Sequence, residues 1–241
     1  MTREDYLARL ETALQDSAEE LQPDDKYRLL SQAVLIFSKD RPLTKIKETT
    51  GNGSAYDFAL PTDWVEGFSY IVGQIEYPAD SYQTPAYLES SDWKLYKKLV
   101  SNVTTTYLRM LTFTPASGNV LRYEYALPHT IDETTNTVLN SDMEAVVNLA
   151  AALCFWALAA KFAQTTSPSI EADVIDYQRK SDIYQLLAKE KMAIYNSLMG
   201  IGAEGAGGQA VGAAPAGVAY ADFDIIYQWS EDMLTHPSRQ H

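Results

Sequence analysis

Histidine and cysteine, the side chains that most often carry nucleophilic or metal chemistry near neutral pH, are scarce in this chain of 241 residues. The histidines are His129, His236 and His241, and Cys154 is the single cysteine. His129 has no Cys or His at a spacing typical of a metal site, and no Ser or Cys in a recognisable triad pattern. Cys154 lies in an apolar helical pattern, which is typical of a buried, unreactive thiol. We therefore predict no catalytic residue, no metal site and no cofactor.

Carboxylates are abundant, and pairs of carboxylates perform glycoside hydrolysis. Adjacent acids occur at 19–20, 24–25 and 132–133. A glycosidase places its two carboxylates across a cleft with separated pKa values, whereas neighbouring acids in an acidic chain are ordinarily solvated. We predict a protein that is not an enzyme, and we keep a carboxylate-dependent glycan (peptidoglycan) hydrolase as the alternative from another class.

Two tryptophans also stand beside acids, Trp64 after Asp63 and Trp93 after Asp92. Aromatic rings beside carboxylates can bind sugars, which would suit the hydrolase alternative. Packing in a small β core or at a subunit interface is the commoner role of such rings. We predict that these tryptophans are structural.

Residues 200–205 match by letter the G-x-G-x-x-G pattern of dinucleotide-binding loops. That chemistry needs a strand before the loop and a helix after it, so that a helix N-terminus meets the pyrophosphate. Here a helical pattern precedes the glycines and a Gly/Ala-rich stretch follows them. The match predicts no nucleotide site.

The C-terminal forty residues point to assembly rather than to catalysis. Residues 200–217 are almost all Gly and Ala, a composition typical of a flexible tether. Residues 218–229 are dense in aromatic and branched apolar side chains, which an isolated segment cannot bury. We predict that this segment docks on a partner as an added strand. The predicted partner-binding residues are Tyr220, Phe223, Ile225, Ile226, Tyr227 and Trp229.

The charge of the chain limits its partners. It has 32 Asp and Glu against 19 Lys and Arg, a net charge of −13. Because DNA binding depends on Lys and Arg at phosphates, we predict no specific DNA binding, although an acidic wall would let DNA slide past. We expect no signal peptide, because the start is charged, and the longest apolar run, 145–160, is too short to span a bilayer. We predict no membrane association, and the single cysteine indicates a reducing compartment.

The first forty residues read as two helices. Thr2 and Asp5 form a capping pattern before leucines at helical spacing, Leu7, Leu10 and Leu14. Pro23 breaks this helix, and a second apolar helical face runs to a proline at position 42. Its members are Tyr27, Leu30, Val34 and Phe37.

Between residues 45 and 130 the pattern changes to β-branched and aromatic residues with frequent turns, which predicts a small β domain. The clearest element is a hairpin that pairs 107–113 with 120–125 through a turn at 115–119. In its return strand Leu121, Tyr123 and Tyr125 face one way, and Arg122 and Glu124 the other. Further strands are predicted at 56–60, 68–77 and 86–88, and a loop at 51–53.

Two long helices follow. Ser141 and Glu144 form a capping box before an Ala-rich helix that we expect to be buried on most sides. Ser167 caps the next helix with a proline at its first position, and this helix runs to Met199, where Gly200 ends it. The predicted apolar stripe of the last helix is Ile175, Ile183, Leu186, Leu187, Met192 and Tyr195.

These elements predict an α+β fold that is mainly α: a helical bundle with an inserted small antiparallel β domain and an extended C-terminal tail. The bundle comprises residues 1–44 and 131–199, and the inserted β domain comprises 45–130. Residues 200–241 form the Gly/Ala tether and the docking strand.

Several short segments, in this order along the chain, carry a family resemblance. The strongest is 144–152, followed by 172–177 and a helix that ends at Tyr195. The others are 41–42, 60–64, 69–71, 75–78, 88–89, 92–96 and the hairpin leading to 127–128. Together, across residues 1–199, they resemble the head-to-tail connector (adaptor) proteins of tailed bacteriophages.

The resemblance implies a structural virion protein without catalytic residues. Such proteins form a homo-oligomeric ring, typically a dodecamer, between the portal protein and the tail, stopper or nozzle proteins. The ring would lie at the neck of the virion after assembly in the host cytoplasm, and packaged DNA would pass through its acidic channel. In related connectors the C-terminal segment reaches toward the portal. A monomeric tail-assembly factor is a second alternative.

Overall fold

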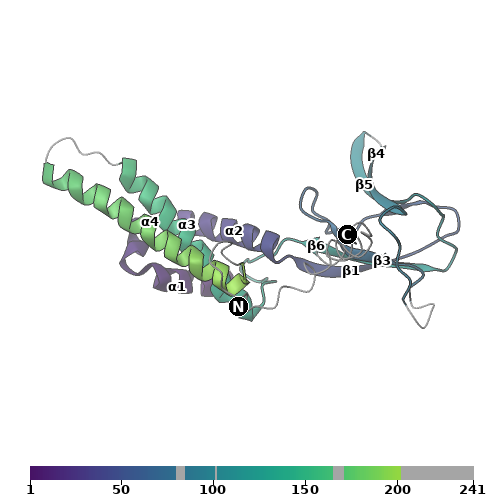
Figure 1. The fold of residues 1–241 in the computed structure, drawn as a ribbon, viewed down its shortest axis with the longest axis horizontal. Helices are drawn as coiled ribbons and strands as arrows, with labels where there is room; N and C mark the ends of the chain where they lie inside the picture. The colour runs from purple at the N-terminus through teal and green to yellow at the C-terminus, as the bar shows by residue number, and fades with distance from the viewer. Residues whose placement is uncertain (80–84, 101, 165–170, 202–241) are drawn as a thin grey trace, which may run out of the picture. The chain divides into compact units, whose positions relative to one another are not determined.

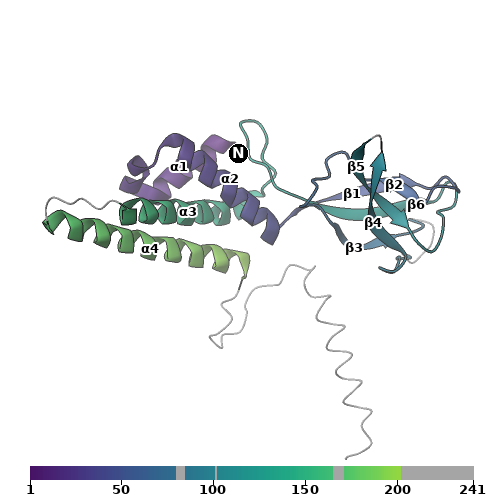
Figure 2. The same cartoon turned by 90° about the horizontal axis from the view of Figure 1, so that it is seen from above.

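The computed structural model describes residues 1–79, 85–100, 102–164 and 171–201 (Figures 1 and 2). The chain falls into two compact units, Met1–Tyr195 and Asn196–His241. The first unit contains the six described strands and nearly all of the helical residues. The predicted docking segment and its tether belong to the second unit and lie outside the described residues.

Helix α1 (Arg3–Leu14) begins as the sequence predicted. The backbone N–H of Thr2 donates to the Asp5 carboxylate at 2.7 Å, which supplies a partner for a backbone donor at the helix start. Leu7, Leu10 and Leu14 are buried, so the predicted leucine face is confirmed.

Helix α2 (Pro23–Asp40) follows a short 3₁₀ segment, Gln15–Glu20. Pro23 is its first residue, a position where the missing N–H of proline costs no hydrogen bond. Leu30, Val34 and Phe37 are buried, as predicted.

Helix α3 (Met143–Gln164) lies at the centre of the helical part, with α1 and α2 on one side and α4 (Glu171–Met199) on the other (Figure 2). The prediction that this Ala-rich helix is buried is confirmed. Small side chains let α1 and α2 come close to its backbone. The fully or nearly fully buried alanines are Ala145, Ala150, Ala151, Ala152 and Ala159.

The segment Asn140–Gln164 is long and apolar enough to cross a membrane by length and composition, which the run 145–160 alone did not suggest. Its most apolar window is 72% buried inside the protein. A core helix passes the same test, and the packing of α1 and α2 on α3 accounts for its composition.

The predicted caps of the two long helices have different outcomes. Ser141 does not cap α3, because it lies in a 3₁₀ turn, Asn140–Asp142, and its hydroxyl donates to Asp142 at 3.3 Å. The predicted cap at Ser167 lies outside the described residues. At the other end of α4, Gly200 has φ +68° and donates its N–H to the Ser197 carbonyl at 3.2 Å, so the predicted glycine stop is confirmed.

The strands form two three-stranded antiparallel sheets. One sheet has the order β1 (Leu43–Thr50), β6 (Val120–Leu127), β3 (Ile71–Glu76), and the other has the order β2 (Asp57–Ala59), β5 (Val103–Met110), β4 (Trp93–Val100).

The two sheets share one apolar core. Both contribute buried side chains, and the predicted alternation of β6 is confirmed, because its three predicted inward residues are buried. The core residues are Phe58, Ile75, Leu108, Met110, Leu121, Tyr123, Tyr125 and Leu127.

The predicted pairing of 107–113 with 120–125 is wrong. β5 pairs with β4 and β2, whereas β6 pairs with β1 and β3, so the chain crosses between sheets at 111–119. The turn in this crossover packs on the predicted loop at 51–53 instead of closing a hairpin. A Cβ at Gly51 would lie 2.5 Å from the Ala116 carbonyl oxygen, so this contact requires glycine.

The other strand predictions are partly confirmed. β2 lies within the predicted 56–60 and β3 within 68–77. The segment predicted at 86–88 makes one isolated bridge, between Tyr87 and Glu76. β1 and β4 were not predicted, because lysines interrupt their apolar pattern.

The predicted fold class, a mainly α helical bundle with a small β insertion, is therefore wrong. The described residues form a mixed α+β fold with four α-helices and two sheets, and the helices do not clearly form a bundle. Two features account for the error. The unpredicted strands β1 and β4 complete both sheets, and part of the apolar stripe of α4 points to solvent instead of into a shared helical core.

Candidate functional site

The six predicted partner-binding residues, Tyr220 to Trp229, lie outside the described residues and stay a prediction.

The thiol of Cys154 is buried in α3 between neighbouring helices. Burial raises its pKa to about 12, so the thiol stays protonated at neutral pH and is a poor nucleophile. The prediction of a buried core cysteine is confirmed.

His129 is buried at the junction between the end of α2 and the connection from β6 to α3. Its Nε2 lies 3.0 Å from the Arg41 carbonyl oxygen and its Nδ1 lies 3.1 Å from Thr137 Oγ1. Because a carbonyl only accepts, Nε2 carries the proton and Nδ1 accepts from the threonine hydroxyl in the neutral ring. Burial lowers the pKa of His129, which favours this neutral form.

Neighbouring polar contacts tie the same junction together. Arg41 pairs with the buried Asp142 at 2.6 Å, just before α3. The Tyr195 hydroxyl of α4 donates to Asp40 at the end of α2. These groups have their partners within the fold, so the contacts at this junction hold together segments that are far apart in sequence.

The carboxylate pairs that motivated the hydrolase alternative lie at the surface. Glu133 pairs with Arg3 at 3.0 Å, Asp25 lies 3.5 Å from Arg28, and both side chains are well exposed. Within the residues that the structure describes, no group of three or more His, Cys, Asp or Glu is placed to hold a metal ion.

The two tryptophans are structural, as predicted. Trp64 stacks on Tyr125 with ring centroids 6.2 Å apart, and Trp93 packs against the same β core. The hydroxyl of Tyr125 donates to one oxygen of Asp63 at 2.8 Å and Lys45 donates to the other at 2.8 Å, so both carboxylate oxygens have partners within the fold.

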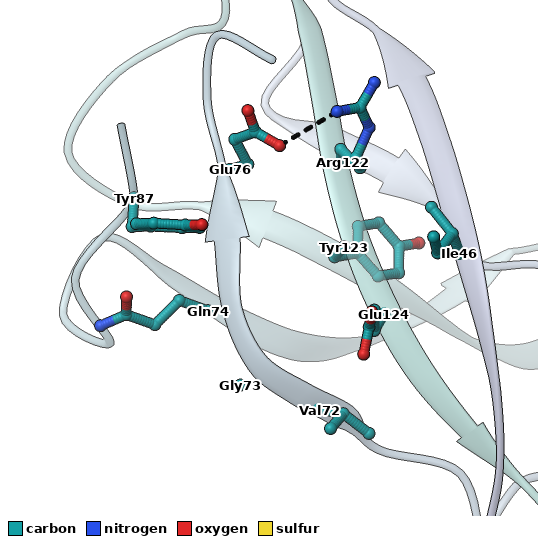
Figure 3. Close-up of a pocket in the computed structure, with 9 residues that line it drawn as sticks. All are labelled: Ile46, Val72, Gly73, Gln74, Glu76, Tyr87, Arg122, Tyr123 and Glu124. Atoms are coloured by element: carbon teal, nitrogen blue, oxygen red, sulfur yellow. Dashed lines mark hydrogen bonds and ion pairs between the residues drawn. The ribbon is translucent and has the colours of Figure 1, made fainter. Parts of the chain in front are cut away.

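A hollow of about 310 Å³ opens on the outer face of the sheet β1-β6-β3 (Figure 3). It exists because β3 bulges: Val72 pairs with Glu124 and Glu76 pairs with Arg122, so three residues of β3 face one residue of β6. Gly73 lies within this bulge at φ +69°, a conformation that favours glycine.

The charges that line this hollow are already paired with one another. Arg122 Nε donates to Glu48 at 2.8 Å, and its Nη1 donates to Glu76 at 3.2 Å. Figure 3 shows the guanidinium reaching across to Glu76, with Tyr87 on the other side of the strand. An arginine held by two carboxylates is poorly suited to receive an anionic ligand, and the row Glu48–Arg122–Glu76 acts as a cross-strand brace.

Exposed surfaces are the more informative feature. On α4, the side chains packed against α3 are Ser181, whose hydroxyl donates to the Ala159 carbonyl at 2.9 Å, and Tyr184, which stacks on Phe155 and Phe162. On the opposite side of the same helix, large apolar residues face solvent. They are Ile183 (49% exposed), Leu186 (67%) and Ile194 (36%), which we call the outer face of α4.

A second surface is the ribbon formed by β4 and β5. One face of the ribbon is basic and aromatic: Arg109 stacks 3.6 Å from the centre of the Tyr96 ring and donates to both oxygens of Asp57 at 2.6 and 2.8 Å. The pKa of Asp57 is lowered chiefly by this hydrogen bond. On the other face Lys97 pairs with Glu66 at 2.5 Å, and this hydrogen bond is the main cause of the lowered pKa of Glu66.

Sequence reasoning missed both surfaces. It assigned the whole apolar stripe of α4 to the interior, although a helix that carries apolar residues on two sides can bury only one of them in a monomer. The lysines of β4 concealed a strand whose alternation was otherwise present, with Trp93, Leu95 and Leu99 on one face.

A comparison with models of protein families finds no match for this chain, and a search of curated proteins finds none either.

Proposed function

We propose that this protein is a structural component of a tailed bacteriophage virion. It forms a ring between the portal and the tail, joins head to tail and lines an acidic channel for DNA. It belongs at the virion neck, is assembled in the host cytoplasm, and acts in assembly and genome packaging rather than as an enzyme.

The outer face of α4 carries the proposal. Ile183, Leu186 and Ile194 recur at helical spacing along about three turns, and a monomer leaves them in contact with water. Large apolar side chains that face solvent along one side of a helix favour a contact with a partner. A repeated helix-to-helix contact between copies would cover this face on every chain of a ring, because closed symmetry uses one interface many times.

The charge of the chain supports the channel role. A net charge of −13 per chain, multiplied by the members of a ring, would produce a strongly electronegative lumen. Such a wall repels phosphates, so DNA would pass without specific contacts. Twelve copies remain our expectation for the ring, based on the family resemblance.

The tail supports assembly with neighbours. Its Gly/Ala-rich stretch and apolar segment predict a tethered docking strand, with the portal and the tail, stopper or nozzle proteins as the expected neighbours.

The test is the mass of the purified full-length protein, measured across a wide concentration range with and without portal protein, followed by imaging of the particles. We expect ring-shaped particles, either alone or on the portal. A protein that is monomeric at every concentration and does not bind portal would contradict the proposal. Hydrolysis of peptidoglycan that a single Asp or Glu substitution abolishes would support the alternative instead.

A further inference from the structure

The ribbon of β4 and β5 presents an open strand edge. β4 is at the end of its sheet, and β5 pairs with β2 only over Tyr107–Arg109. Beyond that point the ribbon extends away from the β core as two strands (Figure 1). Among the described residues no strand or loop hydrogen-bonds to the free side of β4.

The register shows which backbone groups face this edge. The N–H of Leu111 donates to the Asp92 carbonyl at 2.7 Å, just before β4 begins. Because backbone groups alternate between the two sides of a strand, Trp93, Leu95, Lys97 and Leu99 turn their N–H and C=O groups to the open edge. An added strand would find an alternating row of donors and acceptors there.

The side chains of β4 define what kind of strand would fit. Lys94, Tyr96 and Lys98 share one face, and neither β4 nor β5 contains an acidic residue. The neighbouring carboxylate on this face is Asp57 of β2, which pairs with Arg109 and lies 3.9 Å from Lys98. The other face carries Leu95 and Leu99, which are 38% and 67% exposed, with Lys97 between them paired with Glu66. The fitting strand therefore has carboxylates on one face and apolar side chains on the other.

Residues 221–225 of this same chain have that alternation. Asp222 and Asp224 share one face of an extended segment, and Phe223 and Ile225 share the other. An antiparallel register that sets Asp222 opposite Lys98 also sets Asp224 opposite Tyr96, one diagonal step from Lys94, and Ile225 opposite Leu95. Opposite charges across strands and apolar cross-strand pairs both stabilise a sheet.

The other strand edges fit this segment less well. The free side of β3 is occupied, because Tyr77 donates to the Ala86 carbonyl at 2.9 Å and Leu88 donates to the Ile75 carbonyl at 2.8 Å. On its outer face β1 carries Glu48, which lies opposite Arg122 of β6 and pairs with it at 2.8 Å, so this face offers an acidic segment a carboxylate instead of lysines. β2 has only three residues.

We propose that residues 218–229 of one copy pair with the open edge of β4 on a second copy. This inference rests on the proposed ring, which sets copies of the chain beside one another. The Gly/Ala-rich residues 202–217 predict a tether with an average span of roughly 20–24 Å, which suits a contact between neighbours.

The experiment measures hydrogen–deuterium exchange of the segment 93–100 in the full-length protein by mass spectrometry. In the native protein at assembling concentrations, the amides of Leu95, Lys97 and Leu99 are expected to exchange on the order of tenfold more slowly than in Asp222→Lys/Asp224→Lys. The Lys94→Glu/Lys98→Glu variant is expected to lose the same protection of these amides from exchange. Combining all four substitutions restores it, because the charges are exchanged between the strands.

Mixing identifies the source of the strand. The Asp222→Lys/Asp224→Lys chain keeps a native β4 edge, and the Lys94→Glu/Lys98→Glu chain keeps a native tail. In an equal mixture, segment 93–100 of the first chain is expected to regain protection, and its mass distinguishes it from that of the second. Protection in the native protein that is independent of concentration and absent from the mixture would overturn the inference, because the chain's own tail would then be the occupant.

A matched control reverses two exposed basic residues of helices α1 and α2, away from the ribbon and from α4, Arg9→Glu/Lys39→Glu, and is expected to leave exchange at β4 unchanged. An equal loss in this control would show a general charge effect and overturn the inference, as would protection that appears only when portal is added. Ring formation is scored separately by particle mass. Rings in which the amides of β4 are not protected would refute this pairing and leave the proposed function intact. Protection of β4 in particles that contain two chains and never form rings would refute the ring and retain the pairing.

Discussion

Replacing Leu186 by alanine is expected to cost the folded monomer little and to weaken assembly. Leu186 is 67% exposed on the outer face of α4, so about one third of its side chain is covered. Since full burial of a leucine is worth about 1.5–3 kcal/mol, the covered third corresponds to about 0.5–1 kcal/mol. Alanine recovers roughly 0.2 kcal/mol through its higher helix propensity. The expected loss is therefore below about 1 kcal/mol.

The same substitution at Leu158 of α3 is the matched comparison. Leu158 is fully buried, so Leu158→Ala removes contacts on all sides and leaves a cavity. This substitution is expected to lower the free energy of unfolding by about 2–5 kcal/mol. Both positions lie in helices and lose the same atoms, which means that the difference between the variants reports burial alone.

Two measurements separate stability from assembly. Urea denaturation at concentrations where the protein is monomeric gives the free energy of unfolding, and sedimentation velocity at higher concentration gives the assembled fraction. We expect Leu186→Ala to unfold almost as the native protein does and to assemble less. If it were as unstable as Leu158→Ala, the outer face of α4 would be covered within one chain, and if it assembled normally this face would not be the contact between copies.

Three further predictions concern other parts of the chain. Burial lowers the pKa of His129 in the folded chain, so below about pH 6.5 the unfolded chain binds a proton at this residue more readily than the folded chain does. The free energy of unfolding should therefore fall as the pH drops from about 6.5 to the lowered pKa of the folded state. His129→Gln should flatten that part of the curve measured by urea denaturation, and an unchanged slope would contradict the assignment. Gly200→Ala should cost about 1 kcal/mol of thermal or urea stability, because φ is +68° and no neighbour lies within 4 Å of an added Cβ; a stabilised variant would show that the backbone is not constrained there. Deleting residues 218–241 should leave the melting temperature nearly unchanged and reduce docking in an assembly assay, whereas a collapsed melting transition would place the tail in the core.

Several elements could be predicted because local sequence determines them. The leucine face of α1 and the alternation of β6 place apolar residues at the helix and strand periods, and burial follows the same periods. The ends marked by Thr2 and Gly200 were also predictable, since each supplies a conformation or hydrogen bond that the helix end requires.

Pairing between strands could not be predicted in the same way. The turn at 115–119 has hairpin-like residues, yet its glycine N–H donates to the Gly51 carbonyl at 3.1 Å, and the chain changes sheets there. Partner choice depends on contacts distant in sequence, such as Arg122 between Glu48 and Glu76, which no local pattern contains. The predicted docking residues in the tail lie outside the described residues, so the structure bears only on the surfaces that they would meet.

The lysines that hid β4 from prediction also explain how its edge can stay open. An exposed strand edge with Leu95 and Leu99 beside it invites pairing with any other strand, and lysines on edge strands oppose such association by repulsion and solvation. Lys94, Lys97 and Lys98 therefore disfavour pairing between two β4 edges, which would bring like charges together. The same charges favour one acidic strand over others, which makes the edge selective instead of merely protected. Lys94 and Lys98 thus contribute both to resistance to aggregation and to choice of partner, and the exchange of charge between these lysines and the two aspartates tests the second role.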